Sequence, residues 1–193
     1  VLGSGTPVTV KFNAFGIEET AVFKVVSAPV QNGSPELYSI MGDLTGFAHI
    51  HADERPDDAH FMNNGTAQDL TVAWQNGNIA AYTSDNKKSS LIYTTDGGST
   101  WTTITGKPDT ATGGKVALNA DGSKLFWSPS SLTASVYFTD NFGETWYAAG
   151  GLGMGATLYP DKLDPNVIYA TAGGSIYRSD NGGVSFAATG LTV

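Results

Sequence analysis

A short segment containing a turn occurs three times in this chain, and the repeat limits the possible folds more than any other feature. The copies are LIYTTDGGSTW (Leu91 to Trp101), SVYFTDNFGETW (Ser135 to Trp146) and SIYRSDNGGVSF (Ser175 to Phe186). Their turn glycines, Gly98, Gly143 and Gly183, lie 45 and 40 residues apart. Because a four-stranded propeller blade takes roughly 40 to 50 residues, the repeat predicts one blade per copy.

Each turn is preceded by a second extended segment that would pair with the first to form a hairpin. These segments are IAAYT from Ile79, KLFWS from Lys124 and NVIYAT from Asn166. The residues that close the copies, Trp101, Trp146 and Phe186, are expected to begin the next strand and to pack between blades. With the stretch from Ile17 to His49, the pattern predicts an all-β chain of about four blades, the first incomplete.

The composition agrees with this fold and excludes several classes of function. The 193 residues include 24 Gly and only 15% charged residues, unlike a helical protein, while 40% hydrophobic residues suffice for a core. A net charge of −8 argues against binding to nucleic acid or to an anionic membrane. The absence of Cys excludes disulfides and thiolate sites. With no long apolar run and no leader at its start, the chain is expected to be soluble.

The repeated turns resemble the Asp-box of sialidases and related propellers, [S/T]-x-[D/N]-x-G-x-[T/S]-[W/F]. The acidic position of that pattern holds Asp96, Asn141 and Asn181. Asp-boxes are usually structural hairpins, so they indicate a fold and not an activity. Sialidases bind the substrate carboxylate with three arginines, and this sequence has only Arg55 and Arg178. A sialidase is therefore excluded.

The N-terminal quarter carries two further motifs, GIEETAV (Gly16 to Val22) and ELYSIMGDLTGFAH (Glu36 to His49). Followed by Asp-box blades, they resemble the second half of the two-propeller xyloglucanases of glycoside hydrolase family 74. The matching residues are Leu37, Tyr38, Ser39, Gly42, Asp43, Gly46, Phe47 and His49. The resemblance continues to the C-terminus. It implies a single propeller domain or partial propeller over residues 1–193, part of a seven-bladed ring.

What the resemblance implies is an inverting hydrolase that cleaves the β-1,4-glucan backbone of xyloglucan, is secreted, and needs no metal or cofactor. The aspartate of the Gly-Asp-x-x-Gly-Phe motif is the family's general acid, and this role carries over to Asp43. The general base lies in an Asp-x-Gly-Gly-x-Tyr-Arg motif of the N-terminal propeller, and no such motif occurs in this sequence. The expected partners are therefore a xyloglucan or other β-glucan oligosaccharide and an N-terminal propeller from the same gene.

The residues around Asp43 suit a general acid. Gly42 and Gly46 would let the backbone approach a ligand, and Met41, Leu44 and Phe47 would desolvate the carboxyl and raise its pKa. The alternative is a turn aspartate that only satisfies backbone N–H groups. On composition alone that alternative is favoured, and the flanking motif reverses the preference.

Gly42, Phe47, His49 and Trp74 are the predicted substrate-binding residues. Sugar rings stack on aromatic faces, and Trp74, which follows the strand LTVAW, is compatible with either a core or a binding role. Trp101 and Trp146 are expected in the core between blades, and Trp127 is ambiguous.

The segment HIHADERPDDAH (His49 to His60) raises the alternative of a metal site. His49, His51 and Asp53 would share one face if they lay on a strand. The competing interpretation is an acidic loop beside the cleft, and the family implies no metal. The tripeptides at Asn32 and Asn64 would permit N-glycosylation in a secreted eukaryotic protein.

The sequence leaves three functions to compare. The first is the part of a xyloglucan hydrolase that supplies the general acid, inactive without the N-terminal propeller. The second is a non-catalytic propeller module that binds β-glucan or a protein partner, and the third is a purely structural propeller.

Overall fold

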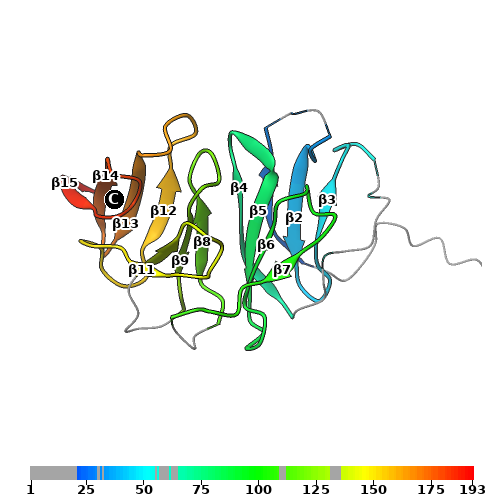
Figure 1. The fold of residues 1–193 in the computed structure, drawn as a ribbon, viewed down its shortest axis with the longest axis horizontal. Coiled ribbons are helices and arrows are strands. Elements are labelled where there is room, and N and C mark those ends of the chain that lie inside the picture. Colours follow the sequence, from blue (N-terminus) through cyan, green and yellow to red (C-terminus); the bar gives the residue numbers. More distant parts are fainter. Residues whose placement is uncertain are drawn as a thin grey trace, which may run out of the picture.

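The computed structural model describes residues 21–29, 31, 33–54, 56, 61, 65–108, 112–130 and 136–193. In these residues the regular structure is entirely β, in four antiparallel sheets that stand side by side (Figure 1). The all-β, four-blade prediction is therefore confirmed. The described residues contain no helix, and so none that is long and apolar enough to cross a membrane.

Each sheet is built from strands that are consecutive in the sequence. The first blade has three strands, β1 (Val22–Ser27), β2 (Leu37–Met41) and β3 (Thr45–His49). The second has β4 (Ala67–Ala73), β5 (Asn76–Ser84), β6 (Leu91–Thr94) and β7 (Thr102–Thr103). The third has β8 (Lys115–Leu118), β9 (Leu125–Ser128), β10 (Tyr137–Thr139) and β11 (Tyr147–Ala148). The fourth has β12 (Thr157–Pro160), β13 (Ile168–Ala172), β14 (Ser175–Ser179) and β15 (Ala187–Thr192).

The first strands of the blades form the inner side of the assembly. β1 contacts β4, β4 contacts β8, and β8 contacts β12. The predicted hairpins form as expected, since β5 pairs with β6, β9 with β10 and β13 with β14. In the described residues the first blade has three strands, and the residues before Ala21 lie outside this description.

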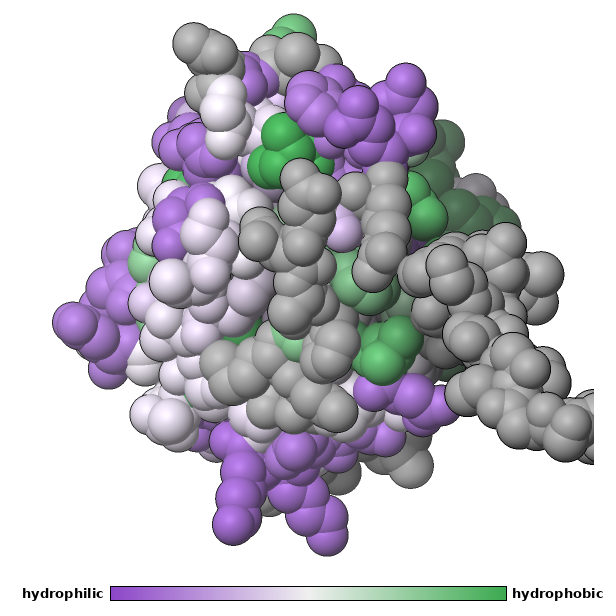
Figure 2. All heavy atoms as spheres, turned by 90° about the vertical axis from the view of Figure 1, so that its right-hand side faces the viewer, coloured by the Kyte–Doolittle hydropathy of each residue, from purple (hydrophilic) through white to green (hydrophobic). Residues whose placement is uncertain are grey.

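The two end blades expose apolar side chains on their open faces. On the first blade, Val22, Phe23 and Val25 are each more than half exposed. Figure 2 looks onto this side of the molecule and shows hydrophobic areas between hydrophilic ones. On the fourth blade, Tyr159 and Tyr169 pair across β12 and β13 and are 54% and 40% exposed.

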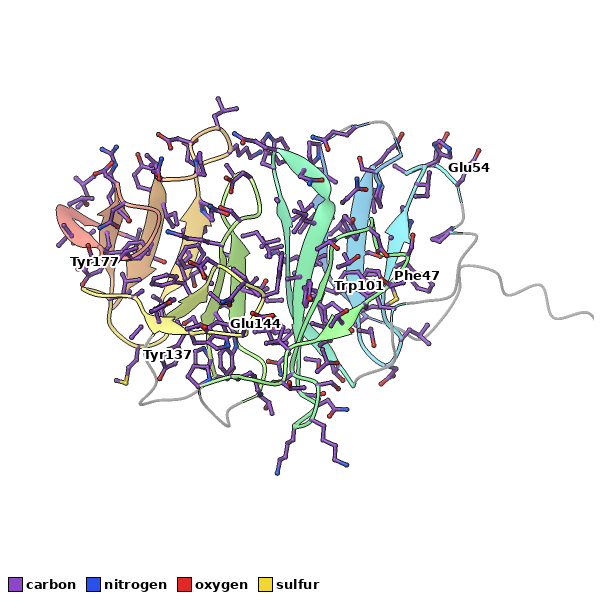
Figure 3. All side chains as sticks on the ribbon, viewed as in Figure 1. Phe47, Glu54, Trp101, Tyr137, Glu144 and Tyr177 are labelled. Atoms are coloured by element: carbon purple, nitrogen blue, oxygen red, sulfur yellow. The ribbon has the colours of Figure 1, made fainter. Side chains whose placement is uncertain are left out.

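The hydrophobic core lies between successive blades. Between the first two, the ring of Trp101 lies 4.2 Å from that of Phe61 and 5.1 Å from that of Tyr82, measured between centroids (Figure 3). Between the second and third, Trp146 lies 6.2 Å from Trp127. The predicted core role of Trp101 and Trp146 is confirmed. Trp127, which was ambiguous, is fully buried, and its Nε1 donates to the Gly113 carbonyl at 2.8 Å.

The two ends of the blades carry different strand connections. The repeat-turn end carries the connections β1–β2, β4–β5, β8–β9 and β12–β13 together with the three repeated turns. Hydrogen bonds join its parts, for example Gln31 Nε2 to the Gln75 carbonyl at 2.7 Å and Gly97 N to the Asn78 carbonyl at 3.0 Å. The Asp43 end carries the β2–β3 and β5–β6 connections at the opposite ends of those strands.

Candidate active site

Asp43 lies at the tip of the hairpin between β2 and β3. Met41 pairs with Thr45, so only Gly42, Asp43 and Leu44 form the loop. Asp43 has φ = 62° and Thr45 has φ = 66°, in the left-handed region that few residues other than glycine adopt. Aspartate tolerates this region better than most residues, because its short side chain is polar. Asp43 therefore occupies the tip of a tight turn, where its side chain is exposed.

The turn is fixed by contacts on both sides. Gly42 N donates to the Ala21 carbonyl at 3.0 Å, and the buried Thr45 donates its Oγ1 proton to the Gly65 carbonyl at 3.3 Å. Backbone strain is retained only where the surroundings hold it, and it is common at functional sites. The Asp43 loop is thus anchored at its base while its tip remains exposed.

Gly46 has a different role from the one expected. A Cβ at this position would lie 2.1 Å from the Ser39 carbonyl oxygen and 2.8 Å from the Phe61 ring. Its missing side chain makes room for protein atoms, so the expectation that Gly46 lets backbone approach a ligand was wrong. At Gly42, a Cβ would meet only the Phe23 ring, at an ordinary 3.7 Å.

The expected desolvation of Asp43 was also wrong for this chain. The Asp43 side chain is exposed, although Met41, Leu44 and Phe47 are all partly buried. Asp43 lies in the three-residue loop beyond the paired ends of the strands, whereas Met41 and Phe47 lie on β2 and β3. These apolar neighbours leave the Asp43 side chain exposed. No hydrogen bond to it is found in the described part of the chain.

Phe47 and His49 lie progressively farther from the turn along β3. Phe47 pairs with Ser39, and its ring lies 6.3 Å from that of His49 (Figure 3). His49 lies four residues beyond Thr45, roughly 13 Å along a strand. Its Nε2 is 2.9 Å from Ser39 Oγ, and burial lowers the pKa of His49, which favours the neutral ring. The structure does not bring His49 to the Asp43 turn.

The predicted grouping of His49, His51 and Asp53 on one strand face does not form. β3 ends at His49, so the following residues leave the sheet. His51 turns to Glu36, with Nδ1 3.8 Å from Oε1. Among the residues that the structure describes, no group of three or more His, Asp or Glu side chains could hold a metal ion. Several residues named in the sequence analysis lie outside the described part of the chain. They are Arg55, His60, the possible glycosylation sites Asn32 and Asn64, and residues 16–20 of the first motif.

Trp74 lies at the repeat-turn end, away from Asp43. It directly follows β4 and forms the β4–β5 connection with Gln75. The Lys162 Nζ lies 3.6 Å from the centroid of its ring. The sequence-predicted residues are thus divided between the two ends of the blades: Gly42 shares the turn with Asp43, and Trp74 does not.

The three repeat turns (residues 94–101, 139–146 and 179–186) share one hydrogen-bond network. The side-chain oxygen of Asp96, Asn141 or Asn181 accepts from the hydroxyl two residues before it and from the backbone N–H four residues after it. The same hydroxyl, from Thr94, Thr139 or Ser179, accepts the N–H of the turn glycine. Because an amide oxygen serves as well as a carboxylate, this position carries no chemistry that needs a charge.

One interior acid was missed in the sequence. Asp69, 5% exposed on the inner strand β4, accepts from Lys24 Nζ at 2.7 Å and from Val116 N at 2.9 Å. It thereby joins β1, β4 and β8 of three successive blades. No signal in the sequence marked it, because alternation along β4 places Asp69 on the face opposite the apolar Leu70 and Val72.

Comparisons with known proteins find xyloglucanases that are similar to this chain. No family model matches the chain. The chain is 37% identical to a xyloglucanase of Paenibacillus sp. over 93% of its length and 18% of that protein's. It is 35% identical to a xyloglucanase of Acetivibrio thermocellus over 96% of its length and 22% of that protein's. The chain therefore spans about a fifth of these relatives.

Solved structures show the same similarity. The crystal structure of a family 74 xyloglucanase from Xanthomonas campestris superimposes with a TM-score of 0.77 at 28% identity, covering 91% of this chain and 25% of that one. A family 74 enzyme from Niastella koreensis gives a TM-score of 0.74 at 29% identity, covering 91% and 24%.

Proposed function

Because the chain is homologous over nearly its whole length to a segment of the xyloglucanases of glycoside hydrolase family 74, we propose that it is part of such a hydrolase and acts on xyloglucan. The observation that carries the proposal is the Asp43 turn: an exposed carboxylate on a strained, anchored loop within the matching motif. In this role Asp43 is the general acid, which protonates the oxygen of the departing sugar while water attacks the anomeric carbon.

Inverting hydrolysis needs a second carboxylate, roughly 6.5 to 9.5 Å from the acid, to activate the attacking water. The motif that supplies this base in the family is absent from this sequence. We propose that it comes from an N-terminal propeller of the same gene product, which faces the Asp43 end. Such a domain would also cover the carboxylate and supply the desolvation that raises a general acid's pKa.

The open faces of the two end blades support a place in a larger propeller. The end blades expose Val22, Phe23 and Val25 on one side and Tyr159 and Tyr169 on the other, and further blades of a seven-bladed ring would cover them.

The repeat turns act in this proposal as Asp-boxes, structural hairpins far from the reacting bond. The whole enzyme is proposed to be secreted, where its polysaccharide substrate occurs.

Among the other predicted substrate-binding residues, Gly42 keeps its role because it shares the loop with Asp43. Phe47 and His49 support the hairpin from the middle of β3 and its far end. A non-catalytic glucan-binding or purely structural propeller is not favoured, since both relatives compared in sequence are named xyloglucanases.

The test is the substitution Asp43→Asn in an enzyme that contains the N-terminal propeller, in one chain or as a complementing fragment. Loss of a general acid costs roughly 10² to 10⁴ in rate, and Asn preserves shape and folding. We expect xyloglucan hydrolysis to fall by that factor while oligosaccharide binding is retained. The loss should shrink for an aryl glycoside, whose leaving group needs little protonation.

Asp85→Asn is the matched control. Asp85 is an exposed carboxylate at the same end of the blades, and its Oδ1 accepts from Thr66 N at 2.9 Å. Hydrolysis by this variant should remain within a fewfold of the parent. If Asp43→Asn behaved like Asp85→Asn, Asp43 would be a turn residue and not the acid.

A further inference from the structure

A cavity of about 340 Å³ lies on the inner side of the molecule, lined by residues of all four inner strands and their connections. We call it the axial cavity. Its walls include Lys24 and Ser27 from the first blade, Thr71 and Trp74 from the second, and Lys162 from the fourth. Since Trp74 and Lys162 follow β4 and β12, they form the part of the cavity wall at the repeat-turn end, away from Asp43.

The rim of the cavity is tied together across blades by one residue, Gln75. Its backbone carbonyl accepts from Gln31 Nε2 at 2.7 Å, and its own Nε2 donates to the Leu163 carbonyl at 2.6 Å. Gln75 N also donates to the Ala120 carbonyl at 2.7 Å. These bonds join the connections of all four blades around Trp74. The indole is therefore held by a preorganised rim, which lowers the cost of ordering a binding site.

The charges of the axial cavity balance. Lys24 is paired with Asp69 at 2.7 Å, and Lys162 lies over the Trp74 ring. The Asp161 carboxylate accepts from the backbone N–H groups of Leu163 and Asp164 at 2.8 and 3.0 Å. Lys24 is thus neutralised by its partner Asp69, and the cavity lining carries Asp161 as well as Lys162, in a chain of net charge −8. This arrangement does not favour an anionic ligand.

We propose that the axial cavity binds one neutral pyranose ring, stacked on Trp74 in the place that the Lys162 ammonium occupies. An indole offers a broad flat surface to the apolar face of a sugar. The hydroxyls of Ser27 and Thr71 and the displaced Lys162 Nζ supply hydrogen-bond partners for the ring hydroxyls. The volume suits a small ligand, near the lower limit of about 300 Å³ for small-molecule sites. This site is separate from the proposed catalytic one.

The experiment is an NMR titration of the indole N–H resonances of the four tryptophans. The probes are D-glucose and D-xylose as neutral pyranoses, and D-glucuronate as a charged analogue of the same shape. We expect a saturable shift of the Trp74 resonance with the neutral sugars and a weaker response to glucuronate. Trp74→Ala should abolish binding, and Trp74→Phe should weaken it about tenfold by reducing the stacking surface.

The resonances of Trp101, Trp127 and Trp146 report whether Trp74→Ala remains folded. No saturable Trp74 shift in the folded parent, or unchanged affinity in folded Trp74→Ala, would overturn the proposal. Tighter binding of glucuronate than of glucose would contradict the proposal that the ligand is a neutral sugar. Asp43→Asn serves to separate the two sites, since it should leave this titration unchanged whether or not it abolishes hydrolysis.

Discussion

At the scale of single residues, the repeat turns show how one position can accept two residue types. Asp96 receives hydrogen bonds from the Thr94 and Thr100 hydroxyls and from Thr100 N. The amide oxygen of Asn141 receives two of these bonds, from the Thr139 hydroxyl and from Thr145 N. The turn needs a side-chain oxygen that can accept these hydrogen bonds, which both Asp and Asn provide. Among the three copies, only Asp96 also carries a negative charge.

That added charge predicts a pH dependence. Burial by itself raises the pKa of Asp96, but hydrogen bonds from Thr100 and Thr94 outweigh it and hold the pKa below its ordinary value. A depressed pKa contributes stability that is present above the unfolded-state pKa, about 4, and is lost as pH falls through the folded-state pKa. We expect Asp96→Asn to lower the free energy of unfolding at pH 7 by at most about 1 kcal/mol, because the group is solvent-exposed.

The difference from the parent should close as the pH falls below about 4, where the Asp96 carboxyl is neutral in the parent too. Denaturant unfolding at a series of pH values measures this difference in the free energy of unfolding. Asp140→Asn, which removes an exposed turn acid next to Asn141, is the matched control for the loss of one negative charge. A difference that grew on acidification would contradict the assigned direction.

At the scale of elements, the repeat turns fasten each blade to the one before it. A Cβ at Gly143 of the third blade would lie 2.3 Å from Ile104 Cγ2, which follows the second blade's last strand. At Gly183 of the fourth blade it would lie 2.3 Å from the Phe126 ring of the third. At Gly98 of the second it would lie 2.9 Å from Ala48 Cβ of the first. The turn glycine is therefore an inter-blade contact as well as a turn residue.

Gly143→Ala should destabilise the chain through both functions of this glycine. Its φ of +98° strains an alanine, and the new methyl group overlaps Ile104. Gly174→Ala is the matched control, because Gly174 has φ = +78° in a hairpin turn with nothing within 4 Å of a Cβ. We expect about 1 kcal/mol for Gly174→Ala and about 1 to 3 kcal/mol more for Gly143→Ala. Equal losses in denaturant unfolding would show that the blade contact contributes nothing.

At the scale of the whole molecule, the blades are joined by apolar packing and by a few polar links near the inner strands. The chief link is Asp69, which holds Lys24 of the first blade and Val116 N of the third. The Asp69 side chain is 7% exposed and that of Lys24 is 43% exposed. Because water reaches the Lys24 ammonium but hardly reaches the Asp69 carboxylate, the carboxylate needs its protein partners more than the ammonium does.

This asymmetry predicts the order of two substitutions. Lys24→Met leaves a buried carboxylate without its cation, whereas Asp69→Asn leaves a neutral amide whose oxygen can still accept from Val116 N. We expect losses of about 2 kcal/mol for Lys24→Met and about 1 kcal/mol for Asp69→Asn, measured as free energies of unfolding. The reverse order would mean that the inter-blade tie does not depend on the charge pair.

The sequence by itself determined the parts of this protein whose contacts are local. The hairpins and the blade period depend on turn residues and on alternation along a strand, and each was predicted from residue types and spacing. The core positions of Trp101 and Trp146 followed from the same pattern.

Only the tertiary structure decided which residues meet across the blades. Asp43 and Trp74 both follow strands in the sequence, yet they lie at opposite ends of the blades, because successive antiparallel strands alternate in direction. The Phe61 ring packs against Gly46, and Asp69 pairs with Lys24, which lies 45 residues away in the sequence. The exposure of Asp43 likewise depends on where the strands stop. Such contacts are fixed by the packing of whole sheets, which residue type and spacing along the chain do not specify.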